Sequence, residues 1–180
     1  GIGAAIVTNI PVSDVLAETG KPLFDYISFS NGTLDKNRKY KLSLDKISPF
    51  EETIFLDADT EIRRDLSPMF EILRHHPIAA RPRVNATKWC FPLWGRESTD
   101  FGLCEYNSGV IGFVRSHPLV NHFFESWASN YSFMGDFHDQ GSFMRSVYNE
   151  GYIPILPLSG EWNATDRNGA DRKLLSASPE

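Results

Sequence analysis

The segment Thr53-Ile54-Phe55-Leu56-Asp57-Ala58-Asp59-Thr60 decides how this chain is interpreted. Its first four residues predict a buried β-strand, and the aspartates follow that strand without a gap. Residues two apart on extended backbone project to the same side, so we expect the carboxylates of Asp57 and Asp59 to lie together. Two such carboxylates repel each other unless a cation lies between them, and hard oxygen ligands suit Mg²⁺ or Mn²⁺. The alternative is a pair of solvated aspartates in a turn, since Asp-x-Asp is common by chance.

Short apolar strands and amphipathic helices alternate on both sides of this segment. The patterns predict strands over 4–8, 24–29, 53–56, 78–80, 109–114 and 153–156, and helices over 11–18, 35–47, 66–73, 117–131 and 136–149. A chain of 180 residues with this alternation predicts a single α/β domain over residues 1–180, with a mostly parallel central sheet flanked by helices. Ligands bind at the carboxyl ends of the strands in such sheets, so polar residues just after strands are the candidates for function.

The composition limits the classes of partner. Hydrophobic residues make up 41% of the chain and charged residues 23%, as in ordinary globular proteins. The formal net charge of −5 argues against a nucleic-acid binder, which normally carries a basic face. A nucleotide ligand needs only a few local cations and stays compatible with this charge. No apolar run has the length of a membrane helix, so we expect no membrane span.

The cysteines and the first residues bear on the compartment. Cys90 and Cys104 match no zinc-binding pattern, and either one disulfide or two reduced thiols fits them. The first eight residues lack the basic start of a signal peptide, which favours the cytoplasm. Asn-x-Ser/Thr acceptor sites for glycosylation matter only in a secretory lumen, and they lie at Asn31, Asn85, Asn130 and Asn163.

Six segments in a fixed order resemble GT-A fold glycosyltransferases, which use nucleotide-diphospho-sugars. They look most like the glycogenin and lipopolysaccharide galactosyltransferase group. The segments are 39–44 (KYKLSL), 48–60 (SPFEETIFLDADT), 66–70 (LSPMF), 107–111 (NSGVI), 138–143 (HDQGSF) and 156–163 (LPLSGEWN). Their joint order is more specific than any one of them, and the resemblance extends over residues 4 to 163. It implies the GT-A fold for the predicted sheet.

The resemblance also implies a donor site. In such enzymes the aspartate pair holds Mn²⁺ or Mg²⁺ on the donor diphosphate, a role that falls on Asp57 and Asp59. The basic residues Arg38 and Lys41 resemble donor-contacting positions, and a cation beside a diphosphate makes charge-assisted hydrogen bonds. The alternative for both is a solvated helix face. Asn107 and Ser108 are expected to hydrogen-bond the transferred sugar, or else to cap a strand.

Asp139 and Gln140 are the predicted catalytic residues. The resemblance places them beside the anomeric carbon, with Asp139 as a general base or sugar-hydroxyl ligand and Gln140 stabilising the charge that develops as the leaving group departs. The alternative for Asp139 is a capping role, because a carboxylate favours the positive end of a helix. The loop aromatics are predicted either to stack on an acceptor sugar or to join the core, and they are Trp89, Phe91 and Trp94.

The predicted function is metal-dependent transfer of a sugar from a nucleotide-sugar, with a UDP-sugar favoured, to a glycan or other hydroxyl acceptor. Rival interpretations are a non-catalytic nucleotide-sugar-binding module and a nucleotidyltransferase, which needs a Gly-rich basic loop after its first strand. A haloacid-dehalogenase-type phosphatase needs threonine where Glu61 stands. The family's late histidine ligand has no counterpart after His138, so we expect water, Asp166 or Asp171 to complete the metal site, or a chain truncated at both ends.

Overall fold

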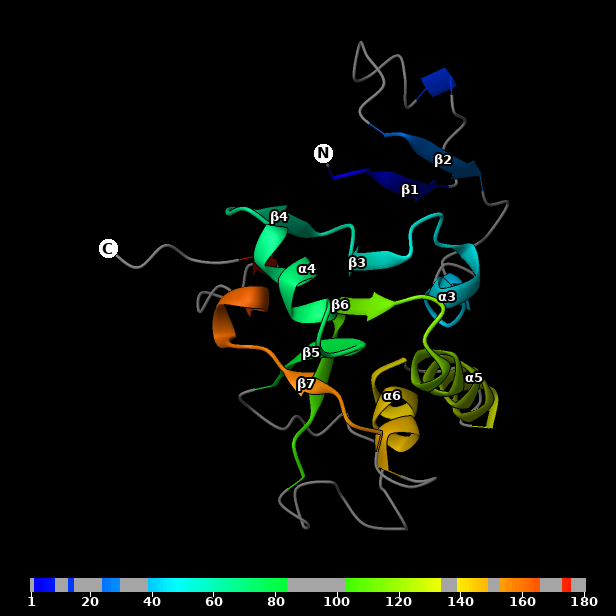
Figure 1. Ribbon diagram of the computed structural model, residues 1–180. Helices are drawn as coiled ribbons and strands as arrows, with labels where there is room; N and C mark the ends of the chain where they lie inside the picture. The colour runs from blue at the N-terminus through cyan, green and yellow to red at the C-terminus, as the bar shows by residue number, and fades with distance from the viewer. Residues whose placement is uncertain are drawn as a thin grey trace.

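The computed structural model describes residues 2–8, 13–14, 24–29, 39–83, 103–133, 139–148, 153–165 and 173–175. These residues form a mixed α/β structure, with helices on both faces of a central sheet (Figure 1). The predicted helix over 11–18 lies outside the described residues except for Ser13 and Asp14, which are helical. No helix in the described ranges combines the length and the apolar character that crossing a membrane requires.

The central sheet contains four strands in the order β3-β6-β5-β7. The strands are β3 (Glu52–Leu56), β5 (Ile78–Pro82), β6 (Tyr106–Val114) and β7 (Leu156–Pro157). β6 runs antiparallel to both β3 and β5, whereas β5 and β7 are parallel. The expectation of a mostly parallel sheet is therefore wrong for these strands, because apolar patterning locates a strand but does not encode its direction. As a consequence, the first residues of β6 lie at the edge where β3, β5 and β7 end.

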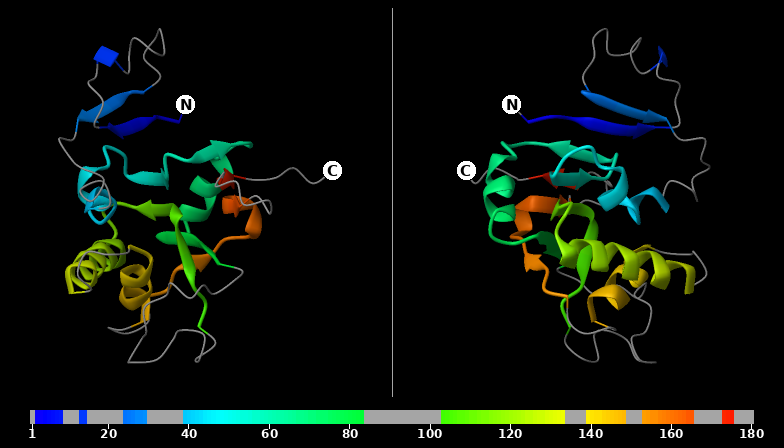
Figure 2. Two further views of the ribbon diagram at one scale, coloured as in Figure 1. Left: turned by 180° about the vertical axis from the view of Figure 1, so that it is seen from behind. Right: turned by 45° about the vertical axis from the view of Figure 1, so that its right-hand side comes forward.

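Two smaller sheets flank this one (Figure 2). β1 (Ala5–Thr8) and β2 (Tyr26–Phe29) pair in parallel, which confirms the strands predicted near both positions. β4 (Thr60–Ile62) pairs with β9 (Lys173–Leu175), which also pairs with β8 (Ala164–Thr165). The sequence did not predict these three strands, because two or three residues are too few to show a period. Strand β7 begins only at the last residue of the segment predicted over 153–156.

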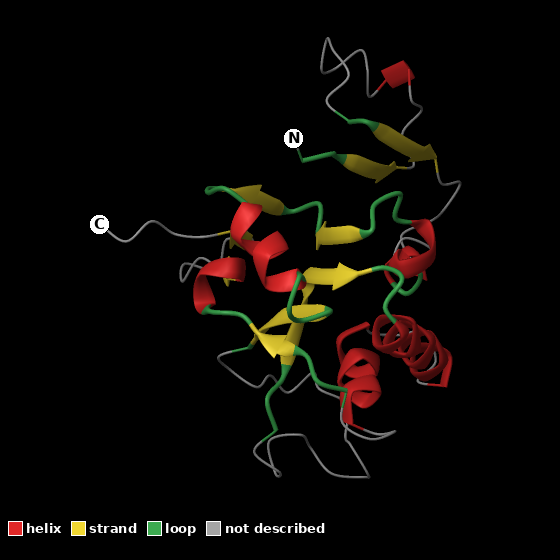
Figure 3. Cartoon of the chain, in the orientation of Figure 1, coloured by secondary structure: helices red, strands yellow, loops and turns green. Residues whose placement is uncertain are grey.

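The helices largely follow the predicted amphipathic segments (Figure 3). They are α3 (Leu44–Ile47), α4 (Ser67–Leu73), α5 (Pro118–Phe133), α6 (Asp139–Tyr148) and the 3₁₀ turn η2 (Gly160–Asn163). α4 begins at a Ser-Pro pair, as expected for a proline in the first turn. The helix predicted over 35–47 is interrupted, since a turn at Leu42 and Ser43 separates the helical residues 39–41 from α3.

A cluster of aromatic rings holds α5 and α6 against one face of the sheet. Phe123, Phe124 and Trp127 of α5 are buried, and so is Phe143 of α6. Phe143 meets Phe123 and Trp127 with ring centroids 4.9 Å apart in both pairs, in the edge-on arrangement that aromatic pairs favour. On the other face, α4 packs its apolar side chains over β6. The starts of α6 and β6 are therefore fixed relative to each other by the core.

The close approach of α4 to β6 depends on a glycine. A Cβ atom at Gly112 would lie 2.9 Å from Met69 Sδ and 3.3 Å from a Leu73 methyl carbon. Both side chains are buried, so they have little room to move. Gly112 therefore lets the helix lie directly on the strand.

Candidate functional site

The Lys41 ammonium group joins two carboxylates at the edge of the sheet where β3, β5 and β7 end. Lys41 Nζ lies 2.8 Å from Asp57 Oδ1 and 3.0 Å from Asp139 Oδ2. Asp57 directly follows β3, Asp139 is the first residue of α6, and Lys41 ends the short helical segment 39–41. Lys41 and Asp139 are 98 positions apart in the sequence. The fold thus brings together three residues that the sequence analysis had selected separately.

This cluster is mostly shielded from water. The side chains of Lys41, Asp57 and Asp139 are 12%, 20% and 19% exposed. Burial lowers the pKa of Lys41, but the carboxylates of Asp139 and Asp57 raise it by more, and the net pKa lies above the usual 10.5. The ammonium group also lies 5.3 Å from the centre of the Phe55 ring, within cation–π range. Lys41 is therefore a permanent positive charge at neutral pH.

Ser108 and Gln140 extend the cluster on the side of α6. The Ser108 hydroxyl donates to Asp139 Oδ2 at 3.0 Å, and the Ser108 backbone N–H donates to Gln140 Oε1 at 3.4 Å. Gln140 Nε2 is buried and has no hydrogen-bond acceptor among the described residues. A buried donor without an acceptor is costly, so such a group is a natural partner for an oxygen of a ligand. Both hydrogen bonds of Ser108 thus go to residues of α6, Asp139 and Gln140.

An irregularity in β6 shapes this end of the sheet. Ala80 of β5 pairs with Ile111, whereas the next residue, Arg81, pairs with Asn107. Residues 108–110 of β6 therefore have no counterparts in β5. Asn107 Oδ1 accepts a hydrogen bond from Gly109 N at 2.7 Å, and Asp57 N donates to Gly109 O at 2.9 Å. The side-chain oxygen of Asn107 thus supports the backbone of the irregularity.

The geometry that the sequence analysis assumed for the aspartate pair is wrong. Thr60 N donates to Asp57 O at 3.0 Å, so residues 57–60 close a turn instead of continuing the extended strand. Asp59 is exposed, while Asp57 is partly buried beside Lys41. Aspartates accommodate turns readily, and the chain must change direction here because β4 already begins at Thr60.

The residues still have the chemistry that a hard divalent cation requires. Mg²⁺ commonly uses one or two protein carboxylates and completes its shell with waters and substrate phosphates. Asp57 and Asp59 are two carboxylates close together in the sequence. Among the described residues no group of three His, Cys, Asp or Glu side chains could hold a metal ion by itself. Asp166 and Asp171, the other predicted ligands, lie outside the described residues.

Two features of the site were missed from the sequence. Arg81, the residue after the predicted strand 78–80, lies opposite Asn107 at the same edge, and burial lowers its pKa. The indole Nε1 of Trp127 donates to Asp139 O at 3.0 Å and to Ser142 Oγ at 3.1 Å. Position after a strand was a signal that pointed to Arg81, but no local signal links Trp127 to α6. Arg38, His138 and the loop aromatics lie outside the described residues.

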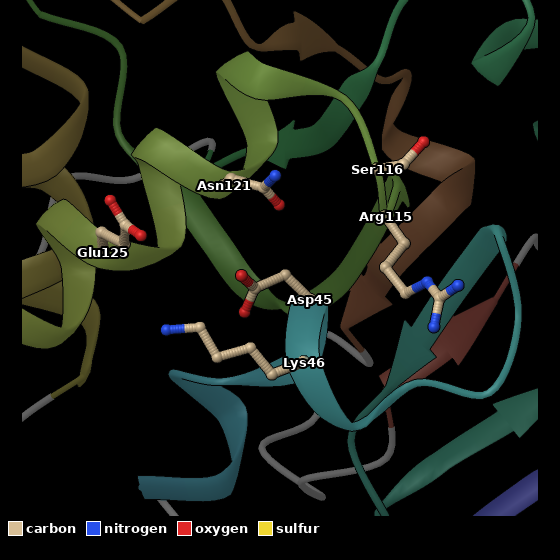
Figure 4. Close-up of a pocket in the computed structure, with 6 residues that line it drawn as sticks. All are labelled: Asp45, Lys46, Arg115, Ser116, Asn121 and Glu125. Carbon is tan, nitrogen blue, oxygen red and sulfur yellow. The ribbon is translucent and has the colours of Figure 1, made fainter.

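A cavity with charged lining residues lies at the opposite edge of the sheet, where β6 ends (Figure 4). Its volume is about 360 Å³, and its lining residues are Asp45, Lys46, Arg115, Ser116, Asn121 and Glu125. Arg115 Nε lies 3.6 Å from Glu51 Oε2, and Ser116 donates two hydrogen bonds to Glu51. Among the predicted site residues that the structure describes, none lines this cavity.

The structure describes one of the two cysteines. Cys104 is an exposed free thiol, and Cys90 lies outside the described residues.

No protein-family model matches the chain, and no curated protein matches it either.

Proposed function

We propose that this chain is a metal-dependent glycosyltransferase of the GT-A type. It transfers a sugar from a nucleotide-sugar donor, with a UDP-sugar favoured, to a hydroxyl group of a glycan or other acceptor. The observation that carries the proposal is the contact of Lys41 Nζ with both Asp57 and Asp139. Three motifs that are far apart in the sequence form one polar cluster at an edge where strands of an α/β sheet end, which is where such proteins bind ligands.

Each described residue of the cluster has a chemical task in this proposal. Lys41 donates to the donor diphosphate, while Asp57 and Asp59 bind the divalent cation, which neutralises the departing diphosphate when bound. Gln140 Nε2, buried and lacking an acceptor among the described residues, donates to an oxygen of the sugar or the leaving group. Asp139 accepts a hydrogen bond from a sugar hydroxyl or the proton of the attacking acceptor. Ser108 positions Asp139 and Gln140 through its two hydrogen bonds.

A thermal-shift panel tests the proposal. UDP, GDP, ADP and CDP, and the corresponding nucleotide-sugars, are added with and without Mn²⁺. A ligand at 100 times its dissociation constant adds ~2.7 kcal/mol of stability, a rise in Tm of roughly 5–10 °C for a domain of this size. We expect such a rise with one nucleotide and only when Mn²⁺ is present. No rise with any nucleotide contradicts the proposal.

Two further measurements separate the enzyme from its rivals. Asp59→Ala should abolish the Mn²⁺-dependent rise and leave the Tm of the ligand-free protein unchanged, because Asp59 is exposed. Glu71→Ala removes an exposed carboxylate from α4 and is the control that should retain the rise. Release of nucleoside diphosphate from the nucleotide-sugar then distinguishes a transferase from a module that binds the donor without turnover.

A further inference from the structure

The Lys41 ammonium group lies between two carboxylates from different parts of the fold, Asp57 after β3 and Asp139 at the start of α6. It lies within 3.0 Å of both Asp57 Oδ1 and Asp139 Oδ2, and its side chain is only 12% exposed. Both contacts are charge-assisted hydrogen bonds, the strong kind. One ammonium charge therefore joins the end of β3 to the start of α6.

This arrangement conflicts with the simplest form of the proposed function. In the proposed function Asp57 binds a divalent cation, yet Asp57 Oδ1 already accepts a hydrogen bond from Lys41 Nζ. An ammonium group and a divalent cation on the same carboxylate oxygen would lie only a few ångströms apart and repel each other. Asp57 therefore binds a divalent cation well only after Lys41 has moved to another acceptor.

We propose that Lys41 gates the metal site, releasing Asp57 to a divalent cation only when a nucleoside diphosphate is present. This inference rests on the proposed function and adds an order of binding to it. The diphosphate supplies the other acceptor, because its oxygens carry more than one negative charge and accept strong hydrogen bonds from an ammonium group. Lysine suits the task, since its flexible four-carbon stem lets one charge exchange partners.

The gate also explains why a single lysine contacts both carboxylates. Without nucleotide, the single positive charge of Lys41 lies between Asp57 and Asp139 and reduces the repulsion of these two mostly buried carboxylates. With nucleotide, the divalent cation takes over the neutralisation of Asp57, and Lys41 stays near Asp139 while it donates to the diphosphate. The positive charge of the site thus rises only when the negative charge of the donor arrives.

Mn²⁺ binding measured by electron paramagnetic resonance tests the gate, since bound Mn²⁺ loses the signal of the free ion. In the parent protein, the nucleoside diphosphate with the largest thermal shift should tighten Mn²⁺ binding at least about tenfold beyond its own chelation of the ion. Lys41→Met keeps the stem and removes the charge, so it should bind Mn²⁺ without nucleotide about tenfold tighter than the parent. Lys46→Met, the same substitution on the exposed surface of α3, should bind Mn²⁺ like the parent.

The stability of Lys41→Met provides a second measurement if this variant folds poorly. Mn²⁺ alone, without nucleotide, should raise the Tm of Lys41→Met by several degrees and leave the parent unchanged, because the ion replaces the lost ammonium charge. The gate is wrong if Lys41→Met gains neither Mn²⁺ affinity nor Tm, or if the parent binds Mn²⁺ equally well with and without nucleotide. The proposed function fails separately, if neither protein responds to any nucleotide with Mn²⁺.

Discussion

The two edges of the central sheet each carry a charged cluster, and the clusters differ in burial. At the edge where β3 ends, Lys41 contacts Asp57 and Asp139, with side chains 12–20% exposed. At the opposite edge Arg115 lies near Glu51, with side chains 41% and 49% exposed. Solvent screens the second pair, whereas removal of one charge from the first leaves its partners buried without compensation. The number of ion pairs at an edge is therefore a poor guide to their importance, and the following variants test this difference.

The largest effect is expected for Lys41→Met. We expect the free energy of unfolding to fall by about 3 kcal/mol, because two mostly buried carboxylates lose their shared cation. Burial lowers the pKa of Lys41, but the two carboxylates raise it by more, so the net pKa lies above 10.5. The contribution of Lys41 to the free energy of unfolding is therefore complete below pH 10.5 and is lost above the raised pKa. Urea unfolding at pH 7 and above pH 10.5 measures both. If the free energy of unfolding falls no more than for an exposed ion pair, Lys41 does not stabilise Asp57 and Asp139 as a buried cation.

A smaller effect, about 2 kcal/mol, is expected for Trp127→Phe. The substitution removes the indole donor to Asp139 O and Ser142 Oγ and leaves a small cavity in the aromatic cluster. Because these bonds hold the start of α6, nucleotide binding with Mn²⁺ should also weaken severalfold. Phe124→Leu, a neighbouring core substitution without such a bond, is the control. Equal weakening of nucleotide binding in both variants would mean that general loosening of the core is responsible.

Asp45→Asn should stabilise the protein by up to about 1 kcal/mol at pH 7. Asp45 is 7% exposed, and its Oδ1 has no hydrogen-bond partner among the described residues. Burial raises the pKa of this carboxyl above 3.8, so the charged form costs stability above its raised pKa and costs none below pH 3.8. The gain should therefore vanish as the pH falls toward 3.8. A destabilised variant at pH 7 would indicate that the charge of Asp45 has a ligand or partner.

The smallest effect is expected for Arg115→Met, about 0.5 kcal/mol or less. Its pair with Glu51 is exposed and spans 3.6 Å. Addition of 0.5 M NaCl should remove even this difference, while the loss in Lys41→Met should persist. Urea unfolding at both salt concentrations makes the comparison, and a loss at Arg115 as large as that at Lys41 would overturn it.

Much of the framework could be predicted from local pattern. The apolar run before Asp57 forms β3, and Ser67-Pro68 starts α4. The aromatic side of the helix predicted over 117–131 is buried as expected. Asp139 begins α6, close to the predicted start of that helix. These successes share a cause, since hydrophobic period and helix-start chemistry act within a few residues and are visible in the sequence.

The sequence pointed to the residues of the Lys41 cluster but not to their geometry. Asp57, Lys41, Ser108, Asp139 and Gln140 were selected from motifs and their resemblance to a family, and hydrogen bonds or ion pairs connect all five. Which group pairs with which was not predictable. The turn at residues 57–60 changes the assumed alignment of the aspartates, and the side chain of Asn107 accepts a hydrogen bond from the backbone of Gly109. Such details depend on the neighbours that the fold supplies.

The sequence by itself determined which segments form most of the longer strands and helices and which polar residues stand near their ends, because both depend on local periodicity and on neighbouring residues. Only the tertiary structure decided that β6 runs antiparallel, that it contains an irregularity at residues 108–110, and that Lys41 forms ion pairs with two carboxylates. Lys41 and Asp139 lie 98 positions apart, and packing of the α5–α6 core against the sheet gives them a common position. Strand direction and long-range charge pairing follow from that packing, which no short segment of the chain encodes.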